Sequence, residues 1–171
     1  MQTQETLLTT YDNFLGSLDG WLVKATEHGG DELLGRKLAD DMFPLSRQIR
    51  FCCNLPGEAM AGAAGVAYSS SDIDDETLPA ARERIAATRA LIKGWRETPF
   101  GADDAPVELS LANGMTFDLQ TLSYVRDWAL PQFYFHLMTA YAILRAAGVP
   151  LGKADYVGFM FRYLRQPSNE A

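Results

Sequence analysis

The sequence has 171 residues, of which 47% are hydrophobic and 22% charged, the balance of a single ordinary globular domain. A chain of this length buries roughly two-thirds of its unfolded surface, so folding requires neither a disulfide nor a structural metal. The formal net charge is −7, and no stretch is rich in Lys or Arg. Nucleic acid is therefore excluded as an expected partner, because binding to its phosphates requires a basic surface. We expect one domain over residues 1–171.

Three further features predict a cytoplasmic protein that does not contact a membrane. Segment 1–5 is polar and acidic, unlike the basic and then apolar start of a cleaved secretory signal. Cys52 and Cys53 are adjacent, which rules out an ordinary disulfide between them, and their apolar surroundings are typical of buried, unreactive thiols. The most apolar stretch, 128–149, is interrupted by polar side chains such as Arg145 and is therefore interpreted as a buried helix.

The first third of the chain has apolar residues at three- and four-residue steps, which predicts two helices. The first helix spans 3–27 and ends at Gly29 and Gly30, with His28 as a cation at its C-terminus. A polar connection over 31–41, with room for one helical turn, follows it.

The second helix is predicted to begin at Met42-Phe43-Pro44, with Asp40 or Asp41 as its cap. It continues into the small residues 61–65, which would allow close approach of a neighbouring helix. Pro56-Gly57 is expected to bend or interrupt it.

A third helix and a β-hairpin are predicted next. Segment 68–77 is rich in Ser and Asp, as loops are, and a helix from Asp75 or Thr77 to about Trp95 follows. Apolar and polar residues then alternate over 107–111 and 115–119, on either side of a turn at residues 112–114. That alternation is typical of a hairpin.

The last long helix is predicted over Pro131–Ala147 and is apolar on nearly every side, so we expect it to be buried all round. The segment 156–164 is aromatic, and we expect the domain or a partner chain to cover it. The fold class predicted from these elements is mainly α: a four-helix bundle with a small β-hairpin before the last long helix.

Familiar catalytic motifs are absent from the sequence. It has no glycine-rich phosphate loop, no Gly-x-Ser-x-Gly, no Cys-x-x-Cys and no His-Glu-x-x-His. His28 and His136 are its two histidines, so one chain cannot supply a three-histidine metal site.

His136 lies in the middle of the most apolar helix, with Gln132 four residues earlier on the same face. Buried polar side chains without partners cost roughly 1 to 3 kcal/mol each, so we expect both to be satisfied. One alternative is a structural hydrogen bond to Arg47, Gln48 or a tyrosine hydroxyl. The other is a ligand-binding or catalytic group that lines a cavity. The candidate ligand-binding residues are Arg47, Gln48, Gln132, His136 and Tyr141, and His136 is also the candidate catalytic residue.

The chain resembles an uncharacterised branch of the DinB/YfiT-like metalloenzyme superfamily over most of its length, and four segments carry the resemblance. They are Asp41-Met42-Phe43-Pro44-Leu45-Ser46-Arg47-Gln48-Ile49, Leu130-Pro131-Gln132-Phe133-Tyr134-Phe135-His136, Thr139-Ala140-Tyr141-Ala142-Ile143-Leu144-Arg145 and Gly148-Val149-Pro150-Leu151-Gly152-Lys153. The resemblance implies a DinB-like four-helix bundle. Many members hold a divalent metal with one histidine from the second helix and a His-x-x-x-His pair on the last.

The resemblance also implies that the metal site of this chain is degenerate. His136 matches the second histidine of the pair, Gln132 replaces the first, and the second-helix ligand falls near Ser46, Arg47 or Gln48. No cofactor is therefore predicted, and a divalent metal is disfavoured.

Three functions follow as alternatives. The first is a binding protein whose former metal site holds a small anionic ligand. The second is an enzyme, either a hydrolase or small-thiol transferase with a rebuilt metal site, or one that uses His136 as a general base with Arg47 stabilising negative charge. The third is a structural protein that forms a homodimer through the hairpin and the aromatic tail.

Overall fold

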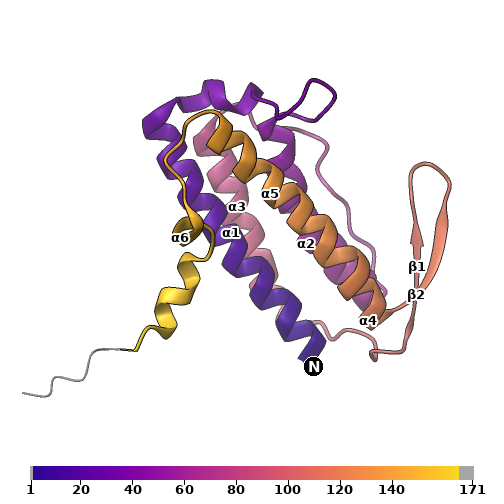
Figure 1. Ribbon diagram of the computed structural model, residues 1–171. Coiled ribbons are helices and arrows are strands. Elements are labelled where there is room, and N and C mark those ends of the chain that lie inside the picture. Colours follow the sequence, from indigo (N-terminus) through magenta and orange to yellow (C-terminus); the bar gives the residue numbers. More distant parts are fainter. Residues whose placement is uncertain (1, 166–171) are drawn as a thin grey trace, which may run out of the picture.

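The computed structural model describes residues 2–165, and four long helices pack in it as a bundle (Figure 1). They are α1 (Gln2–His28), α2 (Leu45–Ala64), α3 (Leu78–Gly94) and α5 (Leu130–Ala146). Around the bundle the order of contacts is α1, α3, α2, α5 and back to α1. The predicted fold class is confirmed, and the first and third helices lie close to their predicted bounds.

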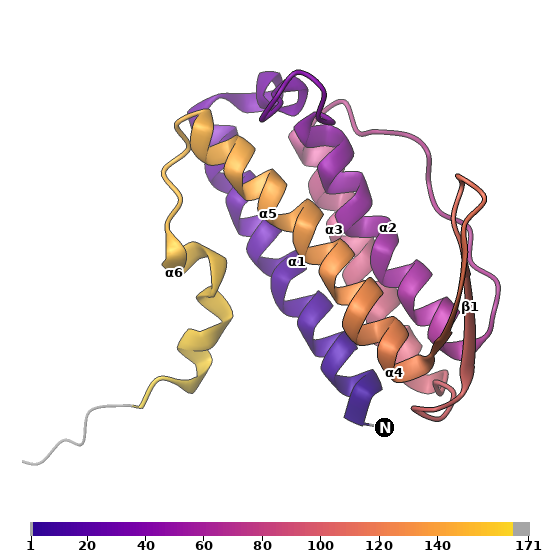
Figure 2. The same ribbon diagram turned by 45° about the vertical axis from the view of Figure 1, so that its right-hand side comes forward.

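The long helices do not simply alternate in direction. α1 and α5 run one way, and α2 and α3 run the other way (Figures 1 and 2). The extended segment 66–77 therefore returns along the whole bundle before α3 begins. The buried side chain of Asn54 fastens this segment to α2, donating to Ser71 O at 2.7 Å and accepting from Ser71 N at 3.3 Å.

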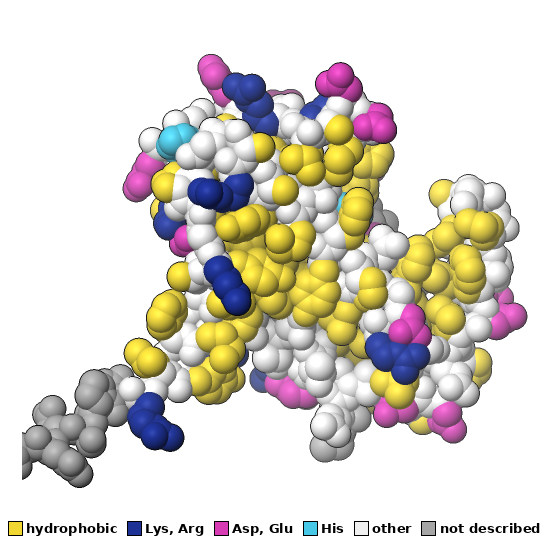
Figure 3. All heavy atoms as spheres, in the orientation of Figure 1, with side chains coloured by type: hydrophobic (Ala, Val, Ile, Leu, Met, Phe, Trp, Pro, Cys, Tyr) yellow, Lys and Arg dark blue, Asp and Glu magenta, His cyan; other side chains and the backbone are white. Residues whose placement is uncertain are grey.

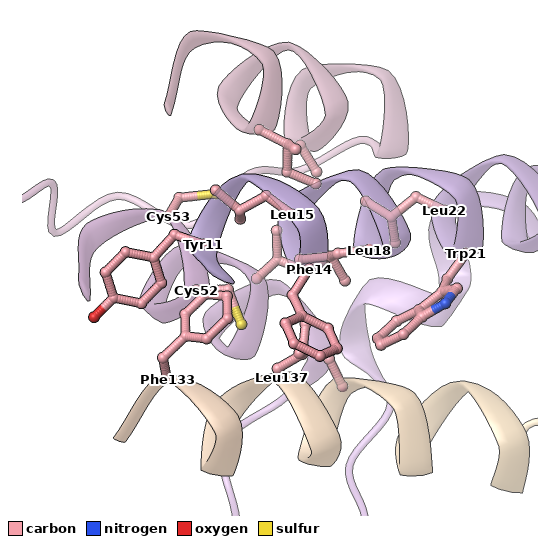
Figure 4. Packing of buried hydrophobic residues seen from close by; sticks show 14 of the residues in the cluster. Tyr11, Phe14, Leu15, Leu18, Trp21, Leu22, Cys52, Cys53, Phe133 and Leu137 are labelled. Carbon is pink, nitrogen blue, oxygen red and sulfur yellow. The ribbon is translucent and has the colours of Figure 1, made fainter. Parts of the chain in front are cut away.

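The interior is formed by the facing sides of the four long helices. Figure 4 shows Tyr11, Phe14, Leu15 and other α1 side chains packed together with Phe133 of α5 and the two cysteines of α2. Tyr11 and Phe133 meet edge to face with ring centroids 4.8 Å apart. Both cysteines are buried and unpaired, and burial raises the pKa of Cys53 to about 12, so the prediction of buried thiols is confirmed.

The start of α2 differs from its prediction. The helix begins at Leu45, with Pro44 as an extended cap residue, and neither Asp40 nor Asp41 caps it. Proline disfavours helical backbone in the residue before it, which is consistent with Phe43 lying outside the helix. Pro56 does not interrupt the helix, because α2 continues through it to the left-handed Gly65 (φ 68°).

Short elements complete the N-terminal half. The 3-10 helix η1 (Gly30–Gly35) occupies part of the polar connection, as predicted, and η2 (Trp95–Glu97) follows α3. Thr77 caps α3 by accepting from Ala80 N at 3.2 Å, and Asp31 Oδ1 accepts from Leu78 N at 2.7 Å. The helix was predicted to start at Asp75 or Thr77, and Thr77 is its cap residue.

The hairpin consists of β1 (Pro106–Ser110) and β2 (Thr116–Gln120), paired antiparallel with Val107 opposite Leu119. It projects from the side of the bundle, and β1 contacts α2 (Figures 1 and 2). Val107 is buried, whereas most of β2 is exposed.

α5 lies within one residue of the bounds predicted for the last long helix, and two short helical elements precede it. The short helix α4 (Thr121–Ser123) and a π-helix, η3 (Tyr124–Ala129), lead directly into α5. Pro131 has no N–H to donate to an earlier carbonyl, which is consistent with an irregular turn just before it.

The prediction that the last helix is buried all round is wrong. Phe135 is 59% exposed and Met138 41% exposed. α5 packs on α1 and α2, which leaves its third side uncovered within residues 2–165. Hydrophobic side chains gather on the face of the molecule that carries α5 (Figure 3).

After α5, the chain forms α6 (Lys153–Tyr156) and η4 (Gly158–Tyr163). The first part is fastened to α1, because Trp21 Nε1 donates to Asp155 O at 3.1 Å and Phe14 contacts the rings of Tyr156 and Phe159. The second part is exposed. Within residues 2–165, the domain therefore covers the aromatic segment 156–164 only as far as Phe159. No helix among residues 2–165 is long and apolar enough to cross a bilayer.

Candidate functional site

Gln48 and His136 meet across the contact between α2 and α5. His136 Nδ1 lies 2.8 Å from Gln48 Oε1, and Gln48 Nε2 donates to Phe43 O at 3.1 Å. Gln48 is 2% exposed, whereas His136 is half-buried. The amide therefore connects the backbone before α2 with a partly accessible imidazole on α5.

This network fixes the tautomer of His136. The carbonyl of Phe43 only accepts, so the nitrogen of the Gln48 amide must face it and the amide oxygen must face His136. That oxygen also only accepts, so Nδ1 of His136 carries the proton and donates. In the neutral ring, Nε2 then holds the free lone pair.

Burial keeps this ring neutral. Desolvation lowers the pKa of His136 from its ordinary value of 6.5 to about 4. At neutral pH, Nε2 is consequently a hydrogen-bond acceptor. It is also a weaker base than an ordinary histidine nitrogen.

Aromatic rings surround the imidazole. The ring centroids of Phe51 and Phe135 lie 4.5 and 5.2 Å from that of His136, and the centroid of Phe43 lies 5.7 Å from that of Phe51. Phe43 and Phe135 are exposed. We call the group of Phe43, Phe51, Phe135 and His136 the aromatic site.

Two arginines border the aromatic site and share one carboxylate. Arg47 Nε donates to Asp74 Oδ2 at 3.1 Å, and Arg50 Nε lies 3.0 Å from Asp74 Oδ1 without the geometry of a hydrogen bond. The guanidinium carbons of Arg47 and Arg50 stand 5.0 and 5.3 Å from the rings of Phe43 and Phe51, respectively. Two cations against one anion leave a net positive charge beside the rings.

The remaining candidate residues lie elsewhere or contribute less. Gln132 is one turn before His136 on α5 and half-buried, but it takes no part in the pair with Gln48. Tyr141 faces α1 and the C-terminal segment, with its ring 5.2 Å from Trp21 and 6.3 Å from Tyr156. The structure therefore does not bring Tyr141 to the aromatic site.

Residues 4–157 match the model of a family described as a domain of unknown function, DUF1993. The chain belongs to the DUF1993 family. Its structure is similar to the crystal structure of a DinB family member protein from Shewanella denitrificans, with a TM-score of 0.79 and 29% identity over 96% of this chain and 97% of that one. No curated protein matches the sequence. The DinB-like resemblance is thus confirmed.

The donor set of this DUF1993 domain does not fit the divalent metal implied by the wider superfamily. Among residues 2–165, no three His, Cys, Asp or Glu side chains come together in a way that could hold a metal ion. At the aromatic site, one ring nitrogen of His136 is already hydrogen-bonded, and its neighbours are an amide and two guanidinium groups. Cations repel a metal ion, so we derive no metal-dependent step.

Sequence reasoning missed the aromatic rings, Arg50 and Asp74. A signal for the ion pairs was present, because Arg47 and Arg50 are three residues apart and so lie on one side of α2. Their partner comes from the loop before α3, which is remote in sequence. The rings carried no signal, since phenylalanines on a bundle helix are equally suited to its core.

Proposed function

We propose that this chain is a binding protein for a small aromatic anion, which it takes up at the aromatic site. The observation that carries the proposal is the hydrogen-bond network that leaves Nε2 of His136 unprotonated, beside exposed rings and a net positive charge.

Each part of the aromatic site has a function in this proposal. Phe43 and Phe135 offer exposed ring surface, on which a planar ligand gains apolar and edge-to-face contacts. Arg47 binds Asp74 through Nε, and its side chain is 37% exposed, so its other nitrogens are open to a carboxylate. Nε2 of His136 accepts a hydrogen bond from a hydroxyl or amine of the ligand.

Binding is supported better than catalysis. A general base works best with a pKa near the working pH, and that of His136 is lowered to about 4. A hydrolase or thiol transferase with a rebuilt metal site would need ligands that the aromatic site does not offer. A hydrogen-bond acceptor that is already held in one tautomer is instead suited to ligand recognition, because binding costs little further conformational entropy at that side chain.

A probe that carries an aromatic ring, a carboxylate and a hydrogen-bond donor tests the proposal. We choose 4-hydroxybenzoate, with benzoate as the matched compound that lacks the hydroxyl donor. Binding is measured by NMR titration of the ¹⁵N-labelled chain. We expect saturable binding of 4-hydroxybenzoate that weakens about tenfold in His136→Phe, the worth of one hydrogen bond. Benzoate should bind the wild type and His136→Phe alike.

His28→Gln serves as the control, because His28 is the other histidine and lies at the end of α1. It should leave the affinity for 4-hydroxybenzoate unchanged. Equal affinity of the wild type and His136→Phe for this probe, or no saturable binding to the wild type, would overturn the proposal.

A further inference from the structure

The outer side of α5 is apolar, although no element of residues 2–165 covers it. Phe135 and Met138 are 59% and 41% exposed on this side. Pro131 lies one turn before them and Ala142 one turn after them. Segment 128–144 contains no Lys, Arg, Asp or Glu, whereas a helix side that faces water normally carries charge. We call Pro131, Phe135, Met138 and Ala142 the α5 stripe.

The α5 stripe has the spacing of a helix that pairs with another helix. Its residues recur at steps of four, three and four, as the core positions of paired helices do. Hydrophobic side chains gather on this face of the molecule (Figure 3). The hairpin and residues 153–165 stand to either side of α5 and do not cross it (Figures 1 and 2). A second helix can therefore reach the stripe along its length.

The two ends of the α5 stripe carry opposite charges. Asp127 precedes the stripe by about one turn, and Arg145 follows it by about one turn. The Asp127 side chain is 54% exposed and is paired with Arg126 at 2.6 Å, an exposed ion pair that contributes little in water. Arg145 is exposed as well, and its Nη1 donates to the backbone oxygen of Val149 at 3.3 Å. Both charged groups are thus open to a further partner.

These opposite charges make the stripe complementary to itself in one orientation. When two α5 helices pair antiparallel about a two-fold axis, Arg145 of each copy faces Asp127 of the other. The same arrangement brings Phe135 of each copy beside Met138 of the other at the centre of the contact. A parallel pair would instead place like charges together.

We infer that the α5 stripe binds the α5 stripe of a second copy of this chain, antiparallel and about a two-fold axis. Phe135 and Met138 are buried at the centre, and two ion pairs between Asp127 and Arg145 close the ends. This face differs from the hairpin and the aromatic tail, through which a homodimer was one of the predicted alternatives. Phe135 also belongs to the aromatic site, so the second copy lies beside that site. The inference does not rest on the proposed function, because dimerisation is measured without ligand.

A charge at the centre of the stripe tests the inference, with molar mass measured by light scattering and affinity by sedimentation. The wild type should dimerise. Met138→Glu should weaken dimerisation about tenfold or more, because it buries a carboxylate of each copy in the apolar centre. Met115→Glu is the matched control, since it makes the same substitution at a 50% exposed methionine next to β2. It should leave the dimer unchanged.

Charge reversal at the ends tests the orientation. Asp127→Arg and Arg145→Glu should each weaken dimerisation about fivefold, because each brings like charges together. The chain with both substitutions should recover most of the affinity, since its charges are complementary again. Far-UV circular dichroism confirms that every variant is folded. A monomeric wild type, an equally tight dimer of Met138→Glu, or a double variant no tighter than the two single variants would overturn the inference.

Discussion

The half-buried ring of His136 ties the stability of the chain to pH. The pKa of His136 is about 4 in the folded chain, against an ordinary value of 6.5 for an exposed histidine. Between these values the unfolded chain binds a proton that the folded chain does not. Stability from the neutral ring is therefore fully present above about pH 6.5 and is lost as the pH falls toward 4.

We expect the wild type to lose about 1 to 2 kcal/mol more stability than His136→Gln between pH 7.5 and 5.0. This difference is smaller than the free energy that corresponds to the whole pKa shift, because solvent screens a half-buried group. Urea unfolding at the two pH values measures the difference. His28→Gln should retain the wild-type pH dependence. Equal losses in the wild type and His136→Gln would show that the ring is not desolvated.

The sequence was informative about the two residues of the central pair. Gln48 and His136 are polar at positions where a bundle is apolar, and a hydrogen bond between them was one of the predicted alternatives. Tyr141 was misplaced for a geometric reason. Five residues on a helix turn the side chain by about 140° from His136, toward α1 instead of α2. Phe43, Phe51 and Phe135 could not be assigned, because neighbouring helices decide which phenylalanines they leave exposed.

At the scale of elements, the small residues of α2 determine how closely η3 approaches. A Cβ on Gly62 would lie 2.6 Å from the hydroxyl of Tyr124, whose buried side chain donates to Glu58 O at 3.3 Å. A Cβ on Gly57 would meet the ring end of Tyr68, which is 38% exposed. The two glycines thus face side chains with very different freedom to move.

We expect Gly62→Ala to destabilise the chain by about 1 to 3 kcal/mol, because Tyr124 cannot move without disturbing the core. Gly57→Ala should cost less than about 1 kcal/mol, since Tyr68 can turn into solvent and alanine favours helix. Chemical denaturation of both variants measures the contrast. Equal stability of Gly62→Ala and Gly57→Ala would contradict the tight packing of Tyr124 in η3 against Gly62 in α2.

Element boundaries were predicted best where one residue acts locally. Thr77, one of the two predicted starts of α3, caps the helix, because a threonine oxygen reaches the next turn of its own helix. Of the predicted bend or interruption at Pro56, the interruption does not occur, since the packing of a long buried helix outweighs one missing hydrogen bond. The exposed side of α5 was missed because hydrophobicity does not reveal how many neighbours a helix has.

At the scale of the whole molecule, the sequence predicted four helices and a hairpin but not their arrangement. The parallel course of α2 and α3 depends on segment 66–77, whose polar composition resembles that of any loop. That segment also brings Asp74 to Arg47 and Arg50. The charge at the aromatic site is thus a product of the overall topology.

The proposed binding depends most on which ring nitrogen of His136 carries the proton. The measurement that tests it most directly is a long-range ¹H–¹⁵N spectrum of the histidine rings at pH 7, with and without 4-hydroxybenzoate. We expect His136 to be neutral and protonated on Nδ1, and the resonance of Nε2 to shift when the probe is added, while His28 stays unchanged. A ring protonated on Nε2, or a cationic ring at pH 7, would contradict the account.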